Sequence, residues 1–115
     1  MKTAGAHAEA LAADYLMRHG LTIVARNFRT RFGEIDLIAR DGRTLVFVEV
    51  RLRRSTRFGG AVESITARKR ARLVAAASGY LAGIGREPPC RFDAILMPSL
   101  DPGTIDWRRD ILGVD

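Results

Sequence analysis

The sequence predicts an α/β fold in which a mixed β-sheet is flanked by helices. Two segments, at residues 4–19 and 66–81, repeat apolar residues at the spacing of amphipathic helices. The stretches between and after them are rich in β-branched residues, which favour strands. With 115 residues and 47% hydrophobic composition, the whole chain, 1–115, is expected to form a single domain with one core region.

The elements are expected in the order αβββαβ, with a short fifth strand at the end. The first helix should end near Gly20, which suits the left-handed conformation that follows many helices. The second helix should begin at a Ser64 or Thr66 cap, and Pro88-Pro89 follows it. Strands are expected at 21–27, 34–40, 44–51, 91–97 and near 104–108. Strands that alternate with helices in this way are typical of a sheet covered by helices.

The net charge of +6 is concentrated in one segment. Residues 51–72 contain eight Arg and Lys residues and one acid, Glu63, so this segment carries +7 and the other 93 residues sum to −1. Such a cluster is expected of a protein that binds a polyanion, although a solvated basic helix face is the alternative. The residues that we expect to contact nucleic acid are Arg53, Arg54, Arg57, Arg68 and Arg72.

The composition also bears on location. No stretch approaches the roughly 20 apolar residues that a membrane span needs, so we expect no membrane partner. The N-terminal segment carries acids inside its apolar part and does not resemble a secretory signal. A lone cysteine, Cys90, fits a reducing compartment. We therefore expect a cytoplasmic protein.

Two carboxylates stand inside apolar strands. Asp36 lies in the run IDLIA and Glu49 in the run VFVEV. An unpaired charge in such a position is costly. The two acids therefore either form a functional site or pair with nearby arginines, and we favour the functional site.

The hairpin between these strands predicts how the acids lie. Asp41-Gly42 is a strong turn signal, and a two-residue turn there places Arg40 opposite Arg43. That register sets Asp36 opposite Phe47, and Glu34 opposite Glu49. Because side chains alternate along a strand, the three carboxylates and Arg51 would then project from one face.

Carboxylates gathered on one face repel each other unless a cation neutralises them. Oxygen ligands favour Mg²⁺ or Mn²⁺ over zinc or copper. We expect Asp36 and Glu49 to hold this cation on the sheet face covered by the first helix. Glu9 lies on the buried stripe of that helix and is a further candidate ligand, the alternative being a helix-edge glutamate that reaches water. On the second helix Lys69 aligns with the apolar stripe, so either it leans toward the site or its stem packs on the core.

Several strings of residues together resemble the YraN-like family of uncharacterised bacterial proteins. They cover nearly the whole chain, and the Gly33–Ile38 and Leu45–Val50 segments are specific when they occur together. The strings are Ala8-Glu9 with Ala12, Tyr15 and Leu16, Arg26-Asn27-Phe28-Arg29, Gly33-Glu34-Ile35-Asp36-Leu37-Ile38, Leu45-Val46-Phe47-Val48-Glu49-Val50, Phe58-Gly59 and Cys90-Arg91-Phe92-Asp93.

That family is similar to archaeal Holliday-junction resolvases and to the restriction-endonuclease-like superfamily, whose signature is Asp followed one strand later by Glu-x-Lys. The resemblance implies that Asp36 and Glu49 are metal ligands and that Glu9 matches a glutamate of the resolvases. It also implies a restriction-endonuclease-like fold. Resolvases of this kind are dimers, which leaves a homodimer open.

The sequence departs from the signature at Arg51, which stands where the superfamily has lysine. A lysine ammonium can lose its proton when desolvated, whereas a guanidinium cannot. Arg51 can stabilise charge on a phosphate but cannot act as a base. Either the enzyme tolerates arginine, or Lys69 supplies the amine, or the site binds without catalysis.

These observations predict a Mg²⁺- or Mn²⁺-dependent, resolvase-like nuclease that acts on structured or branched DNA. Its catalytic residues would be Asp36, Glu49, Arg51 and Lys69. Two alternatives remain open: a DNA-binding module with a relict site, and an interaction protein that uses the basic segment 51–72 to bind an acidic partner.

Overall fold

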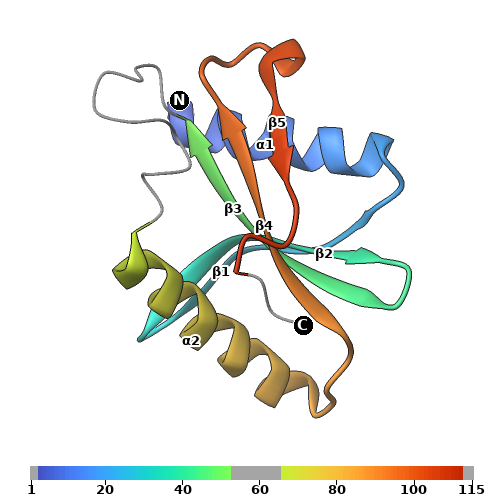
Figure 1. The fold of residues 1–115 in the computed structure, drawn as a ribbon, viewed down its shortest axis with the longest axis vertical. Helices are drawn as coiled ribbons and strands as arrows, with labels where there is room; N and C mark the ends of the chain where they lie inside the picture. The colour runs from blue at the N-terminus through green and yellow to red at the C-terminus, as the bar shows by residue number, and fades with distance from the viewer. Residues whose placement is uncertain (1–2, 53–65, 113–115) are drawn as a thin grey trace.

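The computed structural model describes residues 3–52 and 66–112. The order of elements confirms the predicted α/β arrangement (Figure 1). The elements are helix α1 (Ala4–Arg18), strands β1 (Thr22–Thr30), β2 (Gly33–Asp41) and β3 (Thr44–Leu52), helix α2 (Ala67–Ile84), strand β4 (Cys90–Met97), the short 3-10 helix η2 (Pro102–Thr104) and strand β5 (Asp106–Arg108).

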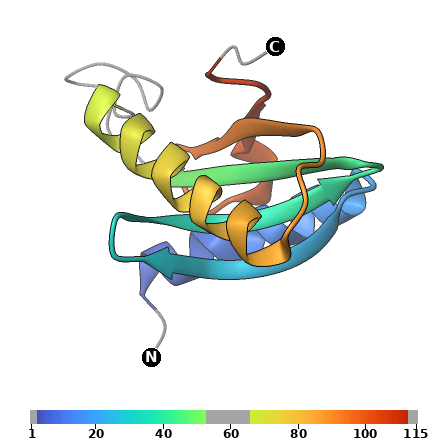
Figure 2. The ribbon, with the colours of Figure 1, turned by 90° about the horizontal axis from the view of Figure 1, so that it is seen from below.

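The five strands form one mixed sheet in the order β1-β2-β3-β4-β5. β3 and β4 are parallel, and the other neighbouring pairs are antiparallel. The helix α2 is therefore the crossover that a parallel pair requires. The two helices cover opposite faces of the sheet (Figure 2). We call the apolar layer beneath α1 the α1 core and the layer beneath α2 the α2 core.

Side-chain caps and glycines set the ends of the helices. Thr3 accepts a hydrogen bond from the backbone N–H of Ala6, and Thr66 caps α2 in the same way. The sequence prediction ended α2 three residues early, because Gly85, at φ 69°, is the residue that closes it. Neither helix in the described part of the chain is long and apolar enough to cross a membrane.

The β2–β3 hairpin has a register that differs from the predicted one by two residues. Asp41 pairs with Thr44, so the turn consists of Gly42 and Arg43 rather than Asp41 and Gly42. Gly42 has φ 60°, and a positive φ at the first central residue alone is typical of a type II′ turn. The shift is even, so the same residues still share a face, but Asp36 now comes opposite Glu49 instead of Phe47.

β1 and β2 share an irregularity halfway along their pairing. Asn27 has a left-handed backbone, with φ 52°. Opposite it, around Asp36, the side chains of β2 stop alternating regularly between the two faces of the sheet. Ile35 packs in the α2 core, although Leu37, two residues later, packs in the α1 core. Regular alternation is therefore broken at Asp36.

The sheet also opens at this point. β2 pairs with β3 only from Leu37↔Val48 toward the Gly42 turn, whereas its pairing with β1 continues to Gly33. β3 in turn stays paired with β4 as far as Leu52. The start of β2 and the end of β3 therefore separate, as Figure 1 shows. Asp36 lies where they part.

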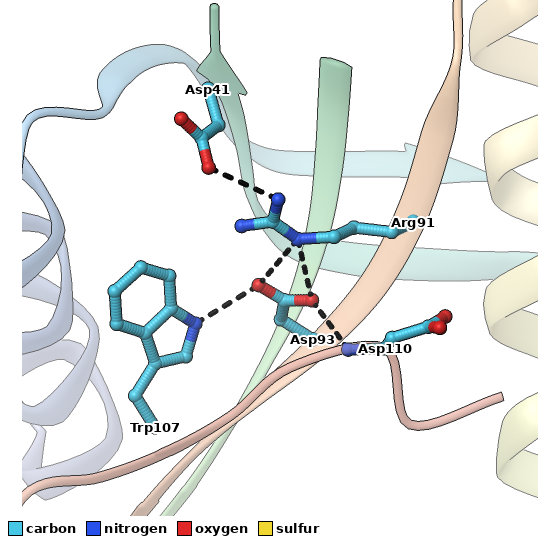
Figure 3. Close-up of polar contacts among 5 residues, drawn as sticks. All are labelled: Asp41, Arg91, Asp93, Trp107 and Asp110. Carbon is cyan, nitrogen blue, oxygen red and sulfur yellow. Dashed lines mark hydrogen bonds and ion pairs between the residues drawn. The ribbon is translucent and has the colours of Figure 1, made fainter. Parts of the chain in front are cut away.

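A buried polar network fastens the C-terminal segment to the sheet (Figure 3). The carboxylate of Asp93 is fully buried. It accepts hydrogen bonds from Nε of Arg91 at 3.1 and 3.2 Å, from Nε1 of Trp107 at 2.9 Å, and from the backbone N–H of Asp110 at 2.9 Å. Arg91 Nη1 also donates to Asp41 at 3.0 Å. Asp93 thus links β4, β5 and Asp110, and Arg91 extends the network to Asp41 at the end of β2.

Candidate metal and nucleic-acid site

Asp36 and Glu49 form a carboxylate pair in the opening between β2 and β3. Oδ2 of Asp36 accepts a hydrogen bond from the backbone N–H of Val50 at 2.8 Å. This bond replaces a strand-to-strand one where β2 leaves β3. The carboxyl groups of Asp36 and Glu49 are hydrogen-bonded to each other. The structure therefore brings together the two residues that the strand pattern singled out.

The electrostatics of the pair favour a bound proton or cation. Burial, and then repulsion by Asp36, raise the pKa of Glu49 from 4.5 to about 8. Burial also raises the pKa of Asp36, against the lowering effect of the Val50 hydrogen bond. The two carboxyl groups therefore favour holding one proton between them over carrying two negative charges. Two partly buried carboxylates cannot both carry a negative charge at low cost. Their oxygens suit a hard divalent cation, with water molecules as its remaining ligands.

The predicted location of the pair beneath α1 is wrong for Glu49. Phe47, on the same side of β3, packs in the α2 core together with Leu73. Glu49 follows two residues later and lines a pocket with Lys69 of α2. The prediction failed because alternation along β3 shows which residues share a face of the sheet but not which helix covers that face.

Glu9 approaches the pair from the α1 side. Its side chain is hydrogen-bonded to Asn27, and burial, followed by repulsion from Asp36, raises its pKa. Yet in the described ranges no three Asp, Glu, His or Cys side chains gather closely enough to hold a metal ion together. Glu9 is thus near the carboxylate pair without joining it as a third ligand.

Cationic side chains surround the pair on the α2 side. A pocket of about 150 Å³, which we call the cationic pocket, is lined by Glu34, Glu49, Arg51, Lys69 and Arg72. Nη1 of Arg51 lies 3.8 Å from Oε1 of Glu49, and Lys69 also attracts that carboxylate. Lys69 is half-buried, as its alignment on the helix predicted. The pocket combines oxygen ligands for a cation with cations for a phosphate.

The other predicted residues fall in three groups. Arg72 lines the pocket, and Arg68 is exposed on α2. Glu34 does not oppose Glu49; it forms an exposed ion pair with Arg29 at 3.2 Å. Arg53, Arg54 and Arg57 lie outside the described residues.

Two residues that matter to the site escaped the sequence reasoning. Asn27 provides the left-handed kink and the partner of Glu9, and asparagine is among the residues that adopt this conformation most readily. A Cβ atom on Gly33 would lie 2.3 Å from the carbonyl oxygen of Arg72. Gly33 thus lets β2 touch α2 at the edge of the pocket. A glycine beginning a strand was visible in the sequence as a sign of close approach.

Comparison with known proteins places the chain in a family. Residues 8–97 match the profile described as Uncharacterised protein family UPF0102, a range that contains Glu9, Asp36, Glu49 and Lys69. The UPF0102 protein of Methylobacillus flagellatus is 52% identical over 110 residues, covering 96% of each chain. UPF0102 protein NE0719 of Nitrosomonas europaea is 52% identical over 106 residues, covering 92% of this chain and 90% of its own.

A third relative, UPF0102 protein Nmul_A0195 of Nitrosospira multiformis, is 48% identical over 115 residues, covering 100% of this chain and 97% of its own. The resemblance to the YraN-like family is thereby confirmed. The chain belongs to the uncharacterised protein family UPF0102.

Proposed function

We propose that this protein is a metal-dependent nuclease that acts on structured or branched DNA. The observation that carries the proposal is the hydrogen-bonded carboxylate pair of Asp36 and Glu49. Glu49 lines the cationic pocket beside Arg51 and Lys69. Buried acids with strongly shifted pKa values are typical of functional sites. The resemblance to resolvases supplies the substrate class, and the basic segment 51–72 has the charge for it.

In this proposal Asp36 and Glu49 hold Mg²⁺ or Mn²⁺, and Glu9 supports the ion through water. Such an ion supplies a Lewis acid and a bound hydroxide. Arg51 and Lys69 neutralise charge that grows on the phosphate. A guanidinium does not serve as a base, so of the two cationic side chains only the amine of Lys69 could take that role.

Replacing Asp36 with alanine should abolish binding of Mn²⁺. We expect the wild-type protein to bind Mn²⁺ weakly, as two-carboxylate sites do, and to release a proton, because Glu49 must lose its own. Calorimetry in two buffers of different ionisation enthalpy measures both effects. Asp14→Ala, which removes an exposed acid from α1, is the matched control and should bind normally. Absence of binding to the wild-type protein would contradict the proposal.

A second experiment concerns the arginine in the lysine position. If Arg51 has left the site without an activating amine, Arg51→Lys should increase cleavage of branched DNA by about 10²–10⁴-fold, the effect of a positioned acid–base group. If Lys69 fills the role, the wild-type protein already cleaves, Lys69→Met abolishes cleavage, and Arg51→Lys changes little. Gel assays with Mg²⁺ or Mn²⁺ distinguish the two cases.

Contaminating nucleases are controlled by adding Glu49→Ala to Arg51→Lys. Activity that survives this double change does not come from the site. If no variant cleaves junction, flap or single-stranded substrates, the result favours the alternative of a DNA-binding module with a relict site.

A further inference from the structure

We propose that Phe32 stacks on an unpaired base of the bound DNA, so that the site selects DNA with unstacked nucleotides. The inference rests on the proposed function and adds the feature by which the substrate is recognised. Phe32 lies in the turn between β1 and β2, and 64% of its surface is exposed. This is the highest value among the exposed large hydrophobic residues of the described chain. Exposure of a large aromatic side chain has an unfavourable hydration free energy, which a stacking partner would remove.

The turn holds Phe32 in a fixed position. Oγ1 of Thr30 accepts hydrogen bonds from the backbone N–H groups of Phe32 and Gly33, each at 3.1 Å, and donates one to the carbonyl of Gly33 at 3.2 Å. Gly33 in turn lies against the backbone of Arg72. A side chain on a turn tied at both ends loses little conformational entropy when it binds a partner.

The turn lies beside the cationic pocket. Figures 1 and 2 both show the β1–β2 turn at the end of the molecule where α2 begins. Gly33 contacts Arg72, and both Arg72 and Glu34 line the pocket. Phe32 is thus two residues from a pocket-lining side chain. A strand with its phosphate in the pocket would carry a neighbouring base to this ring.

The charges around Phe32 favour a polyanion as its partner. The guanidinium of Arg31 lies over the ring, 5.4 Å from its centroid. Arg29, which pairs with Glu34, is exposed near the end of β1, and Arg68 and Arg72 are exposed on α2. A second copy of this chain would bring the same arginines against each other. Repulsion between them argues against a self-association contact at this surface.

The kind of DNA follows from the chemistry of stacking. In an intact duplex both faces of every base are already covered by neighbouring bases. A junction, bubble or single strand offers a free base face, and an aromatic ring can stack on any base. Phe32 therefore distinguishes these forms from continuous duplex without reading sequence.

The test compares binding to a bubble and to a fully paired duplex of equal length by fluorescence anisotropy, in EDTA so that no metal or cleavage is needed. The wild-type protein should prefer the bubble. Phe32→Ala should weaken bubble binding by about 5- to 100-fold and duplex binding by less than about twofold, given the free energy of stacking on one base. Phe32→Trp should retain the preference. Met17→Ala, which shortens an exposed apolar side chain on α1, should change neither affinity.

Two results would overturn the inference. One is an equal loss, or no loss, on the two substrates in Phe32→Ala. The other is a change from dimer to monomer in Phe32→Ala with bubble affinity intact, which would make Phe32 a contact between copies. A wild-type protein that binds neither DNA would instead refute the proposed function, and absence of Mn²⁺ binding would refute the metal site without affecting this comparison.

Discussion

Asp93→Ala should lower the free energy of unfolding by about 3–5 kcal/mol, the usual cost of removing one partner from a buried ion pair. The carboxylate of Asp93 is fully buried and accepts from Arg91, Trp107 and the backbone of Asp110. Alanine leaves Nε of the largely buried Arg91 guanidinium and two further N–H groups without their acceptor, while Nη1 of Arg91 keeps Asp41. The total free energy of unfolding of a small domain is only about 5–15 kcal/mol, so the expected loss is a large share of it.

Urea unfolding followed by tryptophan fluorescence measures this loss, since Trp107 is the single tryptophan and bonds to Asp93 directly. The matched control is Asp106→Ala, which breaks an exposed ion pair with Arg108 and should cost less than about 1 kcal/mol. A similar small cost for both variants would show that the network does not hold the C-terminal segment.

Glu49→Gln should have opposite effects in the absence and in the presence of metal. The folded-state pKa of Glu49, about 8, lies above its ordinary value of 4.5. The stability that this group contributes is therefore complete below pH 4.5 and is lost as the pH rises through 8. Glutamine does not titrate. In EDTA, the free energy of unfolding of the variant relative to that of the wild type should therefore rise by about 2–4 kcal/mol between pH 5 and pH 9.

With Mn²⁺ at pH 8 the order of stability should reverse. In the proposed function the ion would take the place of the proton between Asp36 and Glu49 and stabilise the wild-type protein, whereas the variant would lack a ligand. Thermal unfolding at pH 5, 7 and 9, with Mn²⁺ and with EDTA, gives the comparison. Asp14→Asn, at an exposed acid of α1 outside the cationic pocket, should follow the wild type in every condition. Equal pH dependence of wild type and Glu49→Gln would show that the carboxylate pair is not buried as described.

Local patterns predicted much of the fold. Apolar periodicity gave both helices, and β-branched runs gave the strands, because each of these elements covers a core with a regular stripe. The parity of the hairpin placed Asp36 and Glu49 together even though the register was off by two. An even shift keeps every side chain on its face, so the pairing survived the error.

The parts that escaped prediction depend on contacts between distant segments. The helix that packs over Glu49 was missed because alternation assigns a side chain to one of two faces without showing which helix covers that face. Asp93 belongs to one of the strings that resemble the YraN-like family. The residues near it in the sequence do not indicate that Trp107 and Asp110 donate hydrogen bonds to it. Position 33 requires glycine because the backbone of Arg72, 39 residues away in the sequence, leaves no room for a Cβ atom. Such contacts join residues that are far apart in the sequence, so they leave no local pattern from which a single sequence could predict them.

The shared kink of β1 and β2 also limits which changes of chain length the protein tolerates. Phe28 and Ile35 pair across the strands and both enter the α2 core. Deletion of one residue between Ile23 and Phe28 would turn Phe28 away from that core while Ile35 stayed in place. Compensation would require an equivalent deletion in β2, which would displace Asp36 from the opening of the sheet. Insertions and deletions should thus be absent from 23–38 in working members of the family and should collect in connections such as 98–101, where no strand register depends on the count.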